Sequence, residues 1–272
     1  MRPKMASSAL ISCIAVVTLS AAFAGLRSRR AAADDRAPSP TASRFALDLG
    51  GVRHGLVRAT VDVERTATGQ QHLVLVAQEL SPSLVTILES FAQGKPVKND
   101  LRLTSGAVVR KANDARLVSA RLPALGSGGS TDIELGFDAP SITTQPLLSA
   151  KELPPTPASA RITGFRVDLT GLTAIEAPKL DSITVTQRSD GAATTGELGF
   201  DVGAGGAPPF VSWQKASVGK GAPRAMNVEY IGGDGAVILT LHLDRCTPTT
   251  VKPMGASGTT RVTLACTKVR AG

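Results

Sequence analysis

Two cysteines near the end of the chain, Cys246 and Cys266, have side chains that could form a covalent bond with each other. They lie on either side of a glycine-containing turn predicted at residues 255–258. A disulfide is permitted if the chain is exported, because cytosolic thiols are kept reduced. Two free, buried thiols are the alternative. No histidine or carboxylate motif lies nearby at ligand spacing, so the sequence predicts no zinc site.

The three histidines, His54, His72 and His242, lie in or beside different predicted strands. No serine has the sequence setting of a nucleophile elbow, and no pair of histidines has the spacing of a metal site. His242 alternates with Leu241 and Leu243, which places it on the solvent-facing side of a strand. We therefore expect no catalytic residue, no cofactor and no enzyme activity.

Carboxylates leave one enzymatic alternative, a secreted hydrolase. A glycosidase would need two acids converging on one cleft. The sequence offers scattered acids and fixes no such pair. The candidates are Asp48, Asp62, Glu64 and Asp138.

Glycine-rich segments at residues 128–129, 203–206 and 232–235 could be interpreted as phosphate-binding loops. None of them precedes a helix with a Walker or dinucleotide-binding pattern. The Gly-Gly-Asp-Gly segment favours a hairpin turn that needs positive φ. Gly94-Lys95 and Gly219-Lys220 are typical of helix C-termini, where glycine adopts the left-handed conformation and lysine complements the dipole. A ligand site is the alternative for these two pairs.

The N-terminal segment accounts for most of the net charge of +8. Residues 1–33 hold five basic residues and no acid, which leaves 25 basic against 22 acidic residues in the rest of the chain. No basic cluster is interleaved with aromatic residues, so we expect no nucleic-acid binding. Residues 9–26 are uncharged and follow Arg2 and Lys4, which predicts a signal peptide with a small-x-small cleavage site or an uncleaved membrane anchor. Either one predicts export, to the periplasm, the extracellular space or an outward-facing membrane surface.

Five segments follow from composition and periodicity. Residues 1–30 form the signal peptide or anchor, and residues 31–43 form a flexible tether. Two β modules at residues 44–139 and 161–272 are separated by a proline-rich linker at residues 140–160. The hydrophobic set makes up 42% of the chain and aromatics only 3%, so the cores must be built from Val, Leu, Ile and Ala, which suits sheets.

Each module is predicted to contain strands, one short helix and then more strands. The first helix has one apolar face, with Ser81 as the N-cap and Gly94 after the end. The residues of this face are Leu84, Val85, Leu88 and Phe91. The second helix is predicted at residues 210–217. This order predicts a mainly β fold of two small antiparallel barrels or sandwiches, each with one helix.

The two modules also repeat several residues in the same order. The first strand of each module has the same pattern, with Phe45, Leu47 and Leu49 corresponding to Phe165, Val167 and Leu169. The first triplet is followed by two glycines and the second by one. Further matches suggest an internal duplication, for which chance similarity between glycine-rich hairpins is the alternative. These matches are Gly94-Lys95 with Gly219-Lys220, residues 106–108 with 235–237, Pro123 with Pro248, Gly129 with Gly258, and Leu135 with Leu264.

The second module resembles the tail tube proteins of contractile bacteriophages and related contractile injection systems. The resemblance rests on an ordered set of elements: the helix, the Gly-Lys pair, a strand, a Gly-Asp-Gly hairpin turn, a long apolar strand and a proline-containing turn. In the second module these elements are residues 210–215, 219–220, 226–231, 234–235, 236–244 and Pro248, in that order. The first module resembles the family more weakly.

The resemblance implies a small barrel with one helix, whose copies pair their sheets in rings that stack into a tube. Two fused modules would then give a pseudo-sixfold ring from three chains. The chain departs from the family in its export segment, and in the short segments after Val63 and Thr186 where the family has a long hairpin.

The function expected from these observations is that of an exported structural protein that binds copies of itself, and the membrane only through its N-terminus. Sheet edges would make the contacts. A monomeric exported module that binds a glycan, lipid or protein on loops such as residues 126–130 and 203–207 is the first alternative. The residues expected at self-assembly edges are Phe45, Leu47, Leu49, Phe165, Val167 and Leu169.

Overall fold

The structure, a computed structural model, describes residues 45–56, 58–65, 69–126, 131–146, 158–171, 177–188, 190–217, 222–255 and 258–272. Every described residue belongs to one compact unit, Pro40–Gly272. The predicted signal peptide or anchor and the tether lie outside the described residues. Within those residues, no helix is both long and apolar enough to cross a bilayer.

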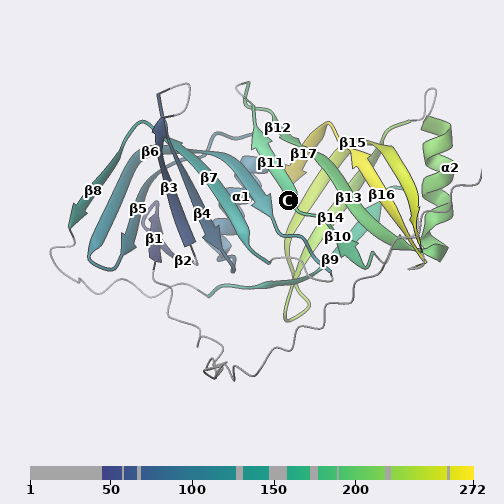
Figure 1. Cartoon of the computed structure of the whole chain (residues 1–272), viewed down its shortest axis with the longest axis horizontal. Helices are drawn as coiled ribbons and strands as arrows, with labels where there is room; N and C mark the ends of the chain where they lie inside the picture. Colours follow the sequence, from purple (N-terminus) through teal and green to yellow (C-terminus); the bar gives the residue numbers. More distant parts are fainter. Residues whose placement is uncertain are drawn as a thin grey trace, which may run out of the picture. The chain divides into compact units, whose positions relative to one another are not determined.

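The described chain is mainly β, as predicted, with two antiparallel sheets and two short α-helices, α1 (Pro82–Ala92) and α2 (Ala207–Ser217) (Figure 1). The first sheet contains β1 (Phe45–Leu49), β2 (Val52–Leu56), β3 (Arg58–Arg65), β4 (Gln71–Ala77), β5 (Lys98–Ser105), β6 (Val108–Leu122), β7 (Ile133–Ala139), β8 (Ile142–Pro146), β11 (Ile183–Gln187) and β12 (Ala193–Thr195). The second contains β9 (Ile162–Leu169), β10 (Lys179–Leu180), β13 (Glu197–Gly203), β14 (Arg224–Gly232), β15 (Val237–Met254), β16 (Thr259–Ala265) and β17 (Lys268–Ala271).

The two sheets share one strand order. The first runs β1-β5-β6-β7-β4-β3, with β2 added outside β1, and the second runs β9-β14-β15-β16-β13-β10. In the chain, α1 lies between β4 and β5, and α2 lies between β13 and β14. In the same way, β8 follows β7 and pairs with β6, while β17 follows β16 and pairs with β15. In the described residues, neither sheet is closed into a barrel by a ladder between its end strands.

The match between the sheets extends to a local irregularity in each long strand. Asp114 in β6 has a φ of 51° and Arg245 in β15 has a φ of 55°, and they are the only non-glycine residues with positive φ in the described chain. Each lies at a bulge in the ladder to the preceding strand, between Asn99 and Leu101 in β5 and between Arg224 and Met226 in β14. A left-handed residue at a bulge bends the strand, so both long strands bend at the same step.

One predicted correspondence is wrong. Pro248 was expected in a turn equivalent to Pro123, but it lies within β15, opposite Leu264 of β16. Pro123 follows the end of β6. A proline fits in β15 there because proline is tolerated where a strand lacks a hydrogen-bonding neighbour on one side.

The predicted module boundary does not separate the strands of the two sheets. The hairpin β11–β12 belongs to the second module in sequence, yet β11 pairs with β6 of the first sheet, with Ile183 opposite Leu122 and Thr186 opposite Ser119. Arg116 in β6 also donates a hydrogen bond from Nη2 to Oε1 of Gln187 at 3.2 Å. The first sheet is therefore completed by the second part of the chain. Part of the predicted linker, residues 142–146, forms the edge strand β8.

The first helix buries Leu84, Leu88 and Phe91 of its predicted face, whereas Val85 is half-buried. Ser81 is the N-cap of α1 and accepts a hydrogen bond from the backbone N–H of Leu84 at 3.3 Å, and Gly94 follows the helix with a φ of 78°. The second helix begins at Ala207, earlier than predicted, and buries Phe210 and Trp213. Most of the buried hydrophobic residues of both sheets and both helices belong to one contiguous hydrophobic core.

Candidate functional site

The strongest candidate site is the outer side of β9, which is the strand at one end of the second sheet (Figure 1). In the described residues, β9 pairs only with β14. Thr170 donates its N–H to the carbonyl oxygen of Ala225 at 3.0 Å, which fixes the phase of this ladder. Because hydrogen-bonded residues alternate along an antiparallel strand, Arg166 and Asp168 bond to β14 through their backbone. The residues between them therefore direct their N–H and C=O groups outward: Phe165, Val167 and Leu169.

The side chains of β9 alternate between buried apolar residues and exposed charged residues. Val167 and Leu169 are fully buried in the core, whereas Arg166 and Asp168 are exposed. Arg166 forms an ion pair with Glu229 of β14, with Nε donating to Oε2 at 2.7 Å. The strand is thus held in place by apolar side chains while its outer backbone groups stay available to another strand.

The other predicted edge, Phe45, Leu47 and Leu49, is not an edge. These residues form β1, which pairs with β2 on one side and β5 on the other. Leu47 lies opposite both His54 and Leu103 and is fully buried. The expectation failed because the chain reverses at Gly50 and Gly51, and the following strand covers the outer side of β1.

No strand equivalent to β2 covers β9 in the described residues. After Leu169 the chain turns at Thr170 and Gly171, and it is next described at residue 177, ahead of β10 at the opposite end of the sheet. The two strands therefore hold equivalent places, but only β1 has its hydrogen-bonding groups matched on both sides.

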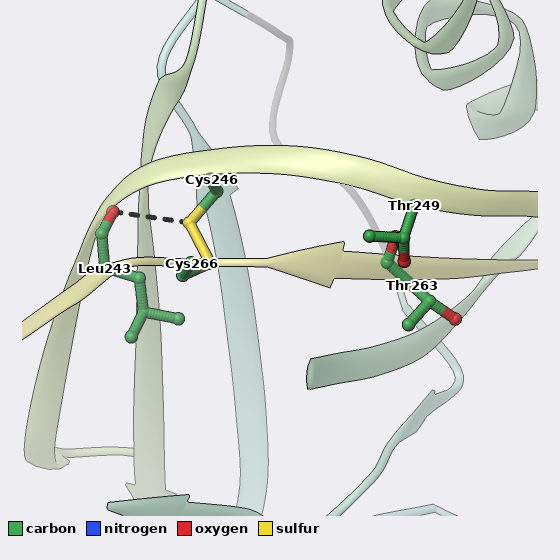
Figure 2. Close-up of a disulfide and its surroundings, with 5 residues drawn as sticks. All are labelled: Leu243, Cys246, Thr249, Thr263 and Cys266. Carbon is green, nitrogen blue, oxygen red and sulfur yellow. Dashed lines mark hydrogen bonds between the residues drawn. A yellow bond between two sulfur atoms is a disulfide. The ribbon is translucent and has the colours of Figure 1, made fainter. Parts of the chain in front are cut away.

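Cys246 and Cys266 form a disulfide in the structure, with an S–S distance of 2.09 Å (Figure 2). Figure 2 shows this bond joining β15 to the chain just after β16. The Cys246 sulfur also lies 3.7 Å from the carbonyl oxygen of Leu243, but a disulfide sulfur has no proton to donate, so this is a contact and not a hydrogen bond. Beyond the disulfide, Thr249 donates a hydrogen bond from Oγ1 to the carbonyl oxygen of Thr263 at 3.2 Å.

His54 lies beside a serine, an arrangement that the sequence did not reveal. Its Nδ1 is 2.9 Å from Oγ of Ser81, the N-cap of α1, and both residues are only 3% exposed. Burial lowers the pKa of His54, and the nearby Asp48 carboxylate opposes this only in part. The pair therefore lies at the N-terminus of α1, where the same Ser81 hydroxyl accepts the hydrogen bond from the Leu84 backbone N–H.

His72 is paired with a carboxylate on the neighbouring strand. Its Nδ1 is 2.7 Å from Oδ1 of Asp138, which lies directly opposite in the β4–β7 ladder. Ser119 Oγ and the His72 ring both lie close to Gly136, where any Cβ would collide with the serine oxygen. The His72–Asp138 pair follows directly from the register of the β4–β7 ladder. The sequence alone does not show that β4 and β7 are neighbours.

These histidines do not assemble a metal centre. His242 contacts Asn227 on the adjacent strand, with Nδ1 and Oδ1 2.8 Å apart. Among the described residues, no three His, Cys, Asp or Glu side chains are grouped closely enough to hold a metal ion.

A groove of about 430 Å³ lies beside α1. Its lining is mostly apolar, with Thr86, Glu89 and Ser159 as the polar residues. The residues come from α1, from the segment before β9, and from β15: Leu80, Pro82, Val85, Thr86, Glu89, Ala158, Ser159, Ala160 and Ile238. Such a groove has the size and polarity of a small-ligand site.

The glycine segments take structural roles where they are described. Gly94 follows α1, and its position lies close to the carbonyl oxygen of Gly191, near β12. Gly235 adopts a φ of 81° in the β14–β15 hairpin. Residues 127–130 and the Gly219-Lys220 pair lie outside the described residues.

No family model matches the chain, and no curated protein matches it.

Proposed function

We propose that this chain is an exported structural protein that self-assembles through sheet edges, in rings or tubes similar to those of phage tail tube proteins. The observation that carries the proposal is the outward-facing backbone of β9, whose hydrogen-bonding groups have no partner strand in the described residues. An added strand would satisfy those groups and extend the sheet. In the ring arrangement, three chains would supply six similar modules.

The pairing of β11 with β6 supports this proposal from within the chain. It joins a strand of one sequence module to the sheet of the other. The same type of contact between chains would need no new kind of chemistry. The shared strand order of the two sheets also favours repeated assembly, since similar modules can make similar contacts.

Size-exclusion chromatography with light scattering and negative-stain electron microscopy of the purified chain test the proposal. We expect oligomers whose size grows with concentration, and rings or tubes in the images. A monodisperse monomer at high concentration would contradict self-assembly.

The groove beside α1 favours a second candidate, a monomeric binding module. Its apolar walls and the single carboxylate of Glu89 suit an apolar ligand that carries a cationic or hydroxyl group. Binding of such ligands to wild type, and its loss in Val85→Trp, would support this candidate, provided that the same protein remains monomeric.

A further inference from the structure

The amino-acid order along β9 is complementary to itself. Val167 lies at the centre, with Arg166 before it and Asp168 after it, and Phe165 and Leu169 lie outside that pair. The exposed charges are therefore opposite in sign and equally far from the centre. A second β9 that runs antiparallel would place Arg166 opposite Asp168 of the second copy.

We infer that β9 pairs with β9 of a second copy, antiparallel, about a two-fold axis through Val167. This inference rests on the proposed function, because it names the strand and the partner that make one of its edge contacts. The two Val167 residues would exchange both backbone hydrogen bonds, and Phe165 would bond in the same way to Leu169 of the second copy. All of these residues direct their backbone groups outward, so the hydrogen-bonding phase of the two strands agrees.

Charge selects this register over its neighbours. An axis through Arg166 would set the two arginines against each other, and an axis through Asp168 would do the same with the two aspartates. Like charges directly opposite destabilise a strand pair, and opposite charges stabilise it. Only the register centred on Val167 pairs each arginine with an aspartate.

Asp168 is suited to receive an arginine. Its side chain is exposed and makes no hydrogen bond or ion pair with any described residue. Arg166 already contacts Glu229 through one edge of its guanidinium, and its five N–H donors allow a second carboxylate to bind. A two-fold contact uses the same surface on both copies and closes on itself, so it would double any assembly that forms through other edges.

Cysteine cross-linking of two differently tagged chains tests the register. Arg166→Cys and Asp168→Cys are made in separate chains, mixed and oxidised. In the inferred register their Cα atoms lie about 4.5 Å apart, within reach of a disulfide. We expect a cross-linked pair that joins the two tags, with the 166–168 bridge identified by mass spectrometry. Neither variant alone should cross-link, because identical positions are diagonal neighbours, about 7–8 Å apart.

Charge reversal gives a second readout in the absence of cross-linking. Arg166→Asp should raise the dissociation constant of the pair about tenfold, since both symmetric ion pairs become repulsive. The double variant Arg166→Asp/Asp168→Arg restores opposite charges and should return the dissociation constant to near the wild-type value. Thr184→Cys, on the exposed face of β11, is the matched control and should not cross-link with Arg166→Cys.

The outcomes separate this inference from the proposed function. Oligomers that form without the 166–168 bridge would overturn the β9 pairing and leave self-assembly standing. Cross-linking of Arg166→Cys with itself would overturn the register. A protein that is monomeric at every concentration would overturn both.

Discussion

β1 and β9 occupy the same place in two sheets of matching strand order, yet they differ in what lies beside them. β1 is covered by β2, which follows it through a two-glycine turn, whereas β9 has no such cover in the described residues. Both strands bury alternate apolar side chains, so their sequences look alike. The difference between a covered strand and an edge strand thus comes from the presence or absence of one neighbouring strand, and the apolar pattern of the strand itself does not reveal it.

The largest expected effect comes from a proline placed in each of the two strands. Leu47→Pro removes a ladder hydrogen bond and a fully buried side chain from the middle of a sheet, and should lower the free energy of unfolding by at least about 3 kcal/mol. Val167→Pro lies where the N–H faces outward, so the fold should survive while β9 loses its ability to pair. Urea unfolding followed by circular dichroism measures the first effect, and size-exclusion chromatography measures the second. Equal destabilisation by the two prolines would contradict the difference between the strands.

Removal of the disulfide should give the next largest effect. The disulfide joins residues that are 20 positions apart in the sequence. Because it restricts the unfolded chain, it should raise the free energy of unfolding by about 2–4 kcal/mol. The Cys246→Ala/Cys266→Ala double variant is expected to lose that amount. Thermal unfolding with and without a reducing agent checks it, because the reducing agent should affect wild type and leave the variant unchanged.

A second disulfide should form at the matching place in the first sheet. The disulfide lies one antiparallel step beyond the ladder pair Thr247–Ala265, because Cys246 precedes Thr247 and Cys266 follows Ala265. Ala115 and Ala139 hold the same places beside the ladder pair Arg116–Asp138. Both alanines are fully buried. Ala115→Cys/Ala139→Cys should therefore oxidise to a bridge and stabilise the protein by up to about 3 kcal/mol. Two titratable thiols after oxidation would show that the sheets do not match at this step.

A smaller effect is expected at the start of α1. Ser81→Ala removes the helix N-cap and leaves Nδ1 of His54 without its partner, which should cost about 1–2 kcal/mol. The 3₁₀ turn η1 (Ala204–Gly206), which leads into α2, has Gly203 at its N-cap and therefore no side-chain cap, so Gly203→Ser offers a change at the matching position of the other helix. It should alter stability by less than Ser81→Ala does. Equilibrium unfolding of the two variants side by side makes the comparison.

The smallest effect is a pH dependence that arises from His54 in the first sheet. The pKa of His54 is lowered by burial, so the unfolded chain takes up a proton at pH values where the folded chain does not. The free energy of unfolding should therefore fall as the pH drops below about 6.5, the ordinary histidine value. His54→Gln should weaken this dependence, whereas His242→Gln, at a more exposed site, should preserve it. Urea midpoints at pH 7.5 and 5.5 measure the difference.

Local patterns predicted the local structure well. The Ser81 cap, the apolar face of α1 and Gly94 gave the first helix correctly, and alternation gave the mainly β character. The correspondence of Leu47 with Val167 is also present in the ladders, where they face Leu103 and Val228. These features depend on residues that are close in sequence, which is why a single sequence reveals them.

Neighbour relations between strands could not be predicted in the same way. Alternation shows which side chains of a strand are buried, but not which strand lies next to it. For that reason the sequence wrongly predicts an edge at β1 and does not reveal the pairing of β11 with β6. The His54–Ser81 and His72–Asp138 contacts were missed for the same cause, since each joins residues that only the tertiary fold brings together.

The position of β11 on β6 sets an order of events in synthesis. A ribosome delivers Ala120 long before Val185, the residue that comes to lie opposite it. Until Val185 has been synthesised, this part of β6 is an exposed strand edge, and nascent chains on neighbouring ribosomes can pair with it and aggregate. A chain truncated before residue 183 can never cover that edge. Aggregation and proteolysis should therefore remove truncated chains in preference to full-length ones.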